Sequence, residues 1–295
     1  MIKDLKGSIV ALITPFNEDG SVNFGKLDEI LDFHLSHKTD ALVILGTTGE
    51  ASTTLHEEDD DICRFTVKKV NGRIPVIAGG GSNCTTTAVA KSKRLEDEGV
   101  DGLLLISPYY NKANEEGMYK HFASVADNVN LPIILYNVPG RTGAYIPENV
   151  VGKLSKHENI VGIKEASGNI SYTAKVARYL NDNFALYSGN DDMIVPALSL
   201  GGKGVISVLA NVLPDETHDM VMDYLNGDVE KAREAQIKYL DLVDALFIEV
   251  NPIPVKEALN LMGMNVGGYR LPLCPMSEAH RNKLAEEMRK VGLIK

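Results

Sequence analysis

The sequence predicts a (β/α)₈ barrel followed by a small C-terminal helical appendage. Short apolar runs, typical of buried strands, alternate with longer segments that carry apolar residues at helical spacing, and eight such units fit into the 295 residues. Strict alternation of this kind implies a parallel sheet with helices outside it. An open sheet that binds a dinucleotide is not supported, because no GxGxxG motif follows the first run.

The order of the predicted elements suggests two parts. The predicted strands are 8–14, 40–45, 75–78, 102–107, 132–136, 160–164, 184–187 and 204–208. The predicted helices between strands include 24–37, 57–69, 85–98, 115–128 and 170–181. Helices are then predicted without strands between them, at 228–249, 254–262 and 277–291. We therefore expect a barrel with the active site over residues 1–225 and a helical region over residues 226–295.

Composition narrows the class of protein and its partners. The chain is 44% hydrophobic and 24% charged, as in ordinary soluble globular proteins, and no apolar run approaches the roughly 20 residues that cross a membrane. The net charge of -10 disfavours nucleic acid and anionic membranes as partners. An anionic substrate would therefore need local hydrogen-bond donors.

The N-terminus and the cysteines bear on location. The first seven residues lead almost directly into an apolar strand, without the layout of a signal peptide. The three cysteines include no CxxC pair, which argues against a disulfide framework or a structural zinc site. A cytoplasmic protein is expected.

Lys164 is the most informative single residue. It ends the apolar run 160–164, at the end of the strand where the active sites of such barrels lie. A lysine in apolar surroundings loses hydration, which favours a neutral amine able to form a Schiff base with a carbonyl substrate. The alternative is a lysine whose ammonium group reaches solvent. Position alone favours this alternative, and the residues at the neighbouring strand ends change the interpretation.

Two of those neighbouring ends carry polar loops. In the loop 46–50, glycines permit a tight turn whose N–H groups can face a carboxylate, and Thr47 and Thr48 add hydroxyl donors. The loop 108–111 contains Tyr110 beside a second tyrosine, and paired tyrosines are more often packing or interface residues than catalysts. A plain glycine-rich turn and a packing pair remain the alternatives.

The fifth strand supplies a partner for the lysine. Tyr136 ends that strand with the same phase that Lys164 has in the next, so the phenol and the amine are expected to be neighbours. Arg141 lies in the adjoining loop and offers a planar cation suited to a carboxylate. After the seventh and eighth strands, backbone groups near Gly189 and Ile206 are expected to face the same pocket.

Asp191 and Asp192 raise the question of a metal site. No histidine or third carboxylate accompanies them at the strand ends. We therefore interpret them as loop or helix N-terminal acids and predict no metal.

Taken together, these motifs resemble the dihydrodipicolinate synthase family of pyruvate-dependent class I aldolases, over essentially the whole chain. The resemblance is carried by the segments 46–50, 108–111, 136–143, 162–168, 204–208, 251–256 and 270–273. It implies a lyase that condenses pyruvate with L-aspartate 4-semialdehyde to 4-hydroxy-tetrahydrodipicolinate, the first committed step of lysine and diaminopimelate biosynthesis. It also implies no cofactor beyond the covalent Schiff base with pyruvate, and a homotetramer built from two dimers.

The resemblance implies catalytic roles for four residues. Lys164 matches the lysine that condenses with pyruvate, and Tyr136 matches the proton donor and acceptor beside it. Thr47 and Tyr110 match the relay partners of that tyrosine, and Tyr110 reaches the site of the neighbouring subunit.

Substrate-binding roles follow in the same way. Thr48 and the backbone of Ile206 match contacts to pyruvate. Arg141 matches the residue that receives the carboxylate of aspartate semialdehyde.

Feedback inhibition by lysine is expected to be weak or absent. In lysine-inhibited members, the site at the dimer interface uses residues matching Ala51, Ser52, His56, Asn83 and Tyr109. Thr87 stands where such members often carry a glutamate, and Asp59 where they often carry a histidine. A threonine cannot pair with a lysine ammonium as a carboxylate can.

Two other functions remain open. A sibling aldolase that cleaves N-acetylneuraminate or a 2-keto-3-deoxy sugar acid would use the same lysine and tyrosine. Arg141 and the Tyr110 relay favour a small acidic aldehyde over a polyol. A barrel without activity that only binds a keto acid is the remote alternative.

Overall fold

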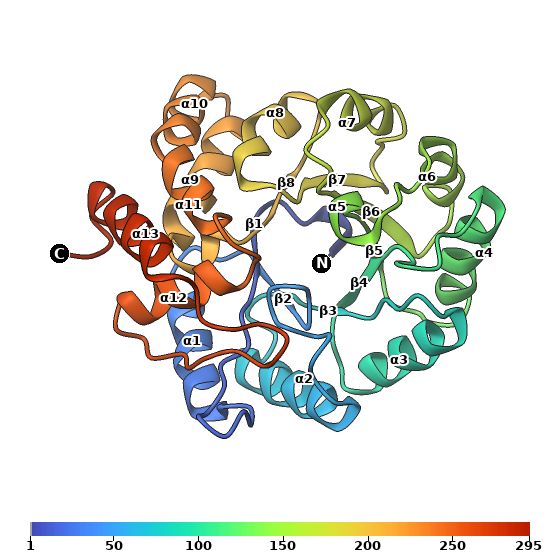
Figure 1. Ribbon diagram of the computed structural model, residues 1–295. Coiled ribbons are helices and arrows are strands. Elements are labelled where there is room, and N and C mark those ends of the chain that lie inside the picture. Colours follow the sequence, from blue (N-terminus) through green and yellow to red (C-terminus); the bar gives the residue numbers. More distant parts are fainter. Residues whose placement is uncertain (1) are drawn as a thin grey trace.

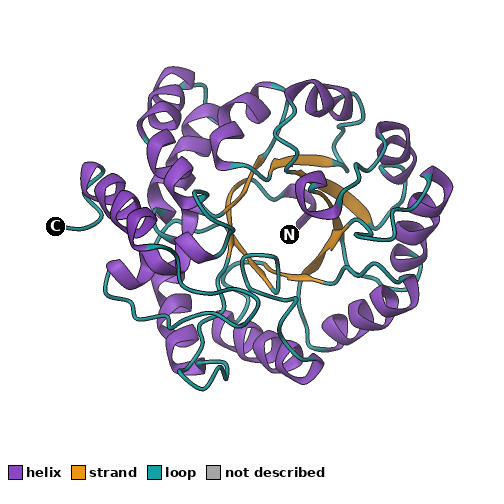
Figure 2. Ribbon diagram, viewed as in Figure 1, coloured by secondary structure: helices purple, strands orange, loops and turns teal. Residues whose placement is uncertain are grey.

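The computed structural model describes residues 2–295, so Met1 of the N-terminal segment lies outside the described residues. Eight parallel strands, β1 to β8, form a closed barrel in chain order, and β8 pairs with β1 to close it. Figure 2 shows the strands as an inner ring surrounded by helices. The predicted (β/α)₈ architecture is confirmed.

The elements have the following bounds. The strands are β1 (Gly7–Ala11), β2 (Ala41–Ile44), β3 (Val76–Gly79), β4 (Gly102–Ile106), β5 (Ile133–Asn137), β6 (Ile160–Glu165), β7 (Ala185–Ser188) and β8 (Gly204–Ser207). The helices up to the end of the barrel are α1 (Phe24–Ser36), α2 (His56–Val70), α3 (Thr85–Asp97), α4 (Glu115–Ala126), α5 (Pro139–Thr142), α6 (Glu148–Leu154), α7 (Ile170–Ala177), α8 (Ile194–Ser199) and α9 (Pro214–Leu225). The later helices are α10 (Val229–Lys238), α11 (Leu240–Leu246), α12 (Ile253–Leu261) and α13 (Glu278–Lys290), and three short 3₁₀ helices are η1 (Ile2–Asp4), η2 (Asp191–Met193) and η3 (Leu209–Asn211).

The helix predicted over 228–249 is in fact two helices, α10 and α11. The backbone leaves helical geometry at Tyr239, where φ is -96° and ψ is 2°. The two helices have different partners, because α10 packs along α9 whereas α11 packs against α13. The chain changes direction to follow those partners, and no proline or glycine marks the change in the sequence. The helices α5, α6, α8 and α9 are additions to the predicted set.

Two apolar layers stabilise the barrel. The smaller lies inside the ring and includes Ile9, Ile77, Ile134 and Ile206. The larger lies between the ring and the helices that cover it. Because both faces of every strand are covered, the strands are nearly continuous apolar runs, as expected for a parallel sheet.

The helices after the barrel gather on one side of it, near α1 and β1 (Figure 1). Within this group, α11 and α12 both pack against α13. The division of the chain after residue 225 stays a prediction, and residues of the later part line the same cavity as the barrel residues. Between residues 2 and 295, no helix combines the length and the apolar character that crossing a bilayer requires.

Candidate active site

Lys164 and Tyr136 lie in contact at the carboxyl end of the barrel. Tyr136 on β5 is in register with Lys164 on β6, so both side chains leave the sheet on the same face. The Lys164 Nζ lies 4.5 Å from the centre of the Tyr136 ring. Both residues are buried, with 6% and 7% of their surface exposed. The predicted neighbourhood of amine and phenol is therefore present in the structure.

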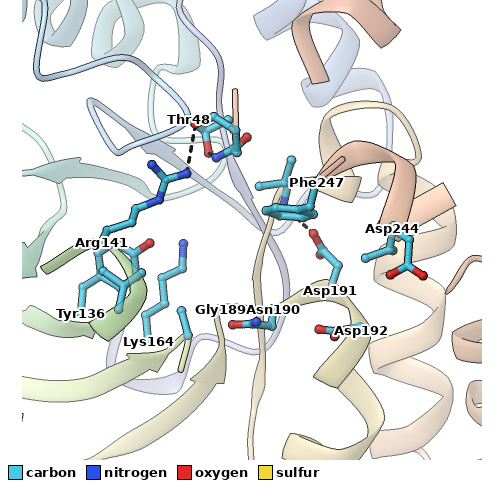
Figure 3. A pocket seen from close by; sticks show the side chains of 15 residues that line it. Thr48, Tyr136, Arg141, Lys164, Gly189, Asn190, Asp191, Asp192, Asp244 and Phe247 are labelled. Atoms are coloured by element: carbon cyan, nitrogen blue, oxygen red, sulfur yellow. Dashed lines mark hydrogen bonds between the residues drawn. The ribbon is translucent and has the colours of Figure 1, made fainter. Parts of the chain in front are cut away.

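A cavity of about 270 Å³ surrounds this pair. Its walls come from the barrel loops and from the helical region after the barrel. They are formed by Thr48, Tyr136, Val138, Arg141, Lys164, Ala166, Gly189, Asn190, Asp191, Asp192, Val208, Val243, Asp244, Phe247 and Asn251. Figure 3 shows Tyr136, Arg141 and Lys164 on one side of the cavity and Phe247 with Asp191 across from them.

Arg141 reaches the cavity from a single helical turn. The helix α5 begins at Pro139, whose ring suits a first helical position, and ends at Thr142, followed by Gly143 with a left-handed φ of 73°. The Arg141 Nη2 donates to the backbone oxygen of Asn251 at 3.0 Å. The Asn251 side-chain amide also donates to the Thr48 Oγ1 at 3.0 Å. Asn251 thus joins the two predicted carboxylate-binding residues to the helical region.

Gly189 allows the loop after β7 to approach the lysine. A β-carbon at this position would lie 2.6 Å from the Ala166 Cβ and 3.0 Å from the Lys164 Cε. Any larger residue would therefore displace the lysine side chain. Gly189 keeps its predicted place at the pocket through this close approach rather than through a side-chain contact.

Asp191 connects the loops after β7 and β8. Its carboxylate accepts hydrogen bonds from the Ser207 hydroxyl at 2.5 Å and from the Val208 and Leu209 amides at 3.0 Å each. Burial raises the pKa of Asp191, while these bonds and the charge of Lys164 oppose the shift. The prediction of a helix N-terminal acid is confirmed, since η2 begins at Asp191.

Asp192 and Asp244 give the cavity an acidic wall. Burial raises the pKa of Asp192, and the charge of Asp244 raises it further. Among residues 2–295, no group of three or more histidine, cysteine, aspartate or glutamate side chains is placed to hold a metal ion. The three cysteines, Cys63, Cys84 and Cys274, are free.

Three predicted site residues do not line this cavity. Thr47 lines an adjoining cavity of about 170 Å³, which it shares with Tyr109 and Tyr136. Tyr110 is 91% exposed and has a left-handed φ of 70°. Ile206 is fully buried inside the barrel. The predicted relay from Tyr136 through Thr47 to Tyr110 is therefore not assembled within one chain.

Sequence reasoning missed the contribution of the helical region. Val243, Asp244 and Phe247, on or just after α11, line the cavity together with Asn251. They reach it through the packing of a helix remote in sequence, and no local pattern indicates this. Asn251 lies in a segment that carried the family resemblance, which was the one available signal.

The fold and this site define an enzyme of the class I aldolase type, in which a buried lysine at the end of the sixth strand faces a phenol. Comparison with known proteins makes the class more specific. The model of the dihydrodipicolinate synthetase family matches residues 4–291. The chain belongs to this family.

Individual relatives agree with the family match. The chain is 56% identical over 288 residues to 4-hydroxy-tetrahydrodipicolinate synthase of Caldicellulosiruptor saccharolyticus, a match that covers 98% of this chain and 97% of the relative. The solved structure of dihydrodipicolinate synthase from Aquifex aeolicus has a TM-score of 0.95 at 44% identity, covering 98% of both chains. That of the Acinetobacter baumannii enzyme complexed with pyruvate has a TM-score of 0.96 at 40% identity, covering 98% of this chain and 100% of the other.

Proposed function

We propose that the chain condenses pyruvate with L-aspartate 4-semialdehyde to form 4-hydroxy-tetrahydrodipicolinate. The observation that carries the proposal is the buried contact of Lys164 with Tyr136, in a cavity that Arg141 also lines. The relatives that match nearly the full chain are named for this activity. They do not favour the alternative of a sugar-acid aldolase.

Covalent catalysis begins at the Lys164 amine. The neutral amine adds to the ketone carbon of pyruvate, the ketone oxygen takes up protons, and water leaves to give a protonated imine. The positive nitrogen withdraws electrons, so the methyl group loses a proton and becomes an enamine. The lysine itself supplies this electron sink, and we propose that no further cofactor takes part.

The second substrate then closes a ring. The enamine carbon attacks the aldehyde carbon, and the aldehyde oxygen takes up a proton to become a hydroxyl group. The amino group of the aldehyde substrate adds to the imine carbon and displaces the Lys164 amine. The displacement forms the six-membered ring of the product and regenerates the enzyme.

Tyr136 is placed to move the protons in these steps. Its ring lies against the Lys164 Nζ, and we propose that its hydroxyl exchanges protons with atoms bonded to the imine carbon. A phenol is a weak base, and hydrogen-bonded partners can pass its proton onward. Thr47, beside Tyr136 in the adjoining cavity, is the first proposed partner.

Tyr110 is the second proposed partner, contributed by another subunit. Its exposure in the single chain supports this role, because a tyrosine that completes a neighbour's site must project from its own surface. We therefore infer an oligomer, a tetramer of two dimers, in which each site is shared. We also propose that the protein works in the cytoplasm, because both proposed substrates are small soluble molecules.

Binding roles divide between two sets of residues in and around the cavity. Thr48, with the backbone at Gly189 and Ile206, is proposed to hold pyruvate. Arg141 is proposed to receive the carboxylate of the aldehyde through charge-assisted hydrogen bonds. The negative net charge of the chain makes these local donors necessary.

The test is chemical trapping followed by turnover. Borohydride with pyruvate should add one reduced pyruvate to the protein, mapped to Lys164, and Lys164→Ala should show none. Trapping at another lysine, or equal trapping in the variant, would refute the assignment. Steady-state turnover of aspartate semialdehyde should greatly exceed cleavage of N-acetylneuraminate or a 2-keto-3-deoxy sugar acid, and the reverse order would overturn the proposed substrate. A barrel that only binds keto acids should show neither trapping nor turnover.

A further inference from the structure

Directly beyond the catalytic pair, β5 and β6 end in a second pair of polar residues. Asn137 follows Tyr136, Glu165 follows Lys164, and the two are in register across the strands. Side chains alternate along a strand, so this pair faces the helix layer while the amine and phenol face the cavity. Both residues are buried, with 0% and 5% of their surface exposed.

The two side chains are joined by a short hydrogen bond. The Asn137 Nδ2 donates to the Glu165 Oε2 at 2.6 Å. The Asn137 Oδ1 accepts from the backbone amide of Ile146 at 2.9 Å. Because an amide N–H can only donate, the oxygen of Asn137 must face Ile146 and the amino group must face Glu165. The direction of the bond follows from its surroundings.

Glu165 extends the network into the loop after β6. Its Oε1 accepts from the backbone amide of Ser167 at 2.8 Å and from the Ser167 hydroxyl. Its backbone oxygen accepts from the amide of Gly189 at 2.7 Å. The same glycine packs against the Lys164 side chain. The Glu165 side chain thus fixes the loop after β6, and the backbone of the same residue holds the loop after β7.

Asn137 does the same for the loop that carries Arg141. The bond from Ile146 to Asn137 closes residues 138–146 back onto the end of β5. The Ile146 oxygen accepts in turn from the Tyr172 hydroxyl on α7 at 2.5 Å. Two hydrogen bonds of the buried Asn137 side chain, to Glu165 and from Ile146, therefore connect the strand of Tyr136, the loop of Arg141 and the strand of Lys164.

We propose that Asn137 and Glu165 are positioning residues, whose mutual hydrogen bond holds the Lys164 amine, the Tyr136 phenol and Arg141 in their catalytic arrangement. The proposal rests on the proposed function for what the arrangement does. Neither residue lines the cavity of the catalytic pair. Their effect must therefore pass through the strands, and a misplacement of about 1 Å can cost on the order of 100-fold in rate.

A residue swap tests the hydrogen bond itself. In Glu165→Gln, an amide N–H₂ meets either the Asn137 amino group or the Ser167 donors, so one donor stays unpaired. In Asn137→Asp, two carboxylates face each other. In the double variant Asn137→Asp/Glu165→Gln, every donor again has an acceptor. The new amide on β6 would donate to the new carboxylate on β5 and accept from Ser167.

The expected pattern is loss in the single variants and recovery in the double variant. Each single variant should lower kcat by about 10- to 100-fold, with a smaller change in the KM for pyruvate. The rate of imine trapping by borohydride should fall in parallel, and the swap should recover most of both losses. Ser167→Ala leaves the hydrogen bond between Asn137 and Glu165 in place, so its kcat should fall less than that of either single variant.

A control at the opposite end of the barrel separates position from stability. Asp40 accepts from the Ser8 amide at 2.7 Å and pairs with His218, far from the cavity. Asp40→Asn should lower the Tm without changing kcat.

Three results would overturn the proposal. One is single variants with a lower Tm and unchanged kcat. Another is a double variant that folds with the parent's stability and still has a low kcat. This outcome counts against the proposal even if the single variants fail to fold. The third is an Asp40→Asn enzyme whose kcat is as low as that of the single variants at a similar Tm, because the loss of rate would then follow from lost stability. If the parent traps pyruvate and does not turn over aspartate semialdehyde, the proposed function fails, and the trapping rates still test the positioning.

Discussion

The ammonium of Lys256 lies 2.7 Å from the carboxylate of Glu50, and solvent reaches neither side chain. Lys256 belongs to α12, whereas Glu50 ends the loop that carries Thr47 and Thr48. The Lys256 Nζ also lies 4.3 Å from the centre of the Phe16 ring. The helical region is therefore tied to the substrate loop by a buried charge pair.

Removing one member of this pair should strongly destabilise the fold. Burial lowers the pKa of Lys256 and the Glu50 charge opposes that shift, so the charge of the lysine depends on its partner. Lys256→Met should cost about 3–5 kcal/mol of unfolding free energy, because it removes the ammonium that pairs with the buried Glu50 carboxylate. Denaturant unfolding measures this loss.

The matched control removes both charges together. Glu50→Gln/Lys256→Met has no buried charge at the site, so its loss should be clearly smaller than that of Lys256→Met alone. Equal losses in the two proteins would show that the pair is not energetically coupled.

Tyr136→Phe should separate proton transfer from imine formation. General acid–base transfer contributes about 10²- to 10⁴-fold, so kcat should fall by that order while pyruvate still binds. Tyr224→Phe on the outer helix α9 is the control and should leave kcat unchanged. A Tyr136→Phe enzyme with near-parental kcat would remove the phenol from the mechanism.

The barrel and the central pair were predictable because strand geometry is strict. Alternation of side chains and the parallel register place Tyr136 and Lys164 together once their strands are known. Asp244 and Phe247 were not predictable in this way, since they reach the cavity only through the packing of α11. Asn137 and Glu165 look like ordinary polar residues in the sequence, and only their register and burial distinguish them.

L-Lysine should inhibit the enzyme weakly or not at all. Asp59 is committed to Lys91, whose Nζ lies 2.9 Å away, and to the Thr54 hydroxyl at 2.6 Å. Thr87 offers no carboxylate to an incoming ammonium. Initial rates at increasing lysine concentration measure the effect. Half-inhibition at micromolar lysine would contradict both the sequence-based expectation and the ion-pair argument.

The His218–Asp40 pair should make stability depend on pH. The Asp40 hydrogen bond, at 2.7 Å, raises the pKa of His218 above its usual value of 6.5, and partial burial opposes it. Because the folded pKa exceeds the unfolded one, the contribution is complete below pH 6.5 and is lost as pH rises through the folded pKa. It should amount to at most roughly 1 kcal/mol for a pair of this exposure.

The measurement compares the parent with Asp40→Asn. Their difference in unfolding free energy, followed from about pH 5.5 to about pH 8.5, should shrink as the pH rises. The hydrogen bond from the Ser8 amide to Asp40 contributes a part of this free-energy difference that does not vary with pH. A difference that grows toward alkaline pH would reverse the assigned sign.

Arg141→Ala should weaken the second substrate and leave the first almost untouched. A hydrogen bond to a charged group is worth about 1.5–3 kcal/mol, so kcat/KM for aspartate semialdehyde should fall at least about 10- to 100-fold. Borohydride trapping of pyruvate at Lys164 should continue at a similar rate, because the guanidinium contacts Asn251 rather than the amine. Arg141→Lys keeps the cation and loses the planar fork, so its kcat/KM for aspartate semialdehyde should lie between those of the parent and Arg141→Ala. If Arg141→Ala instead abolished trapping and spared the aldehyde, the arginine would belong with the residues that bind pyruvate.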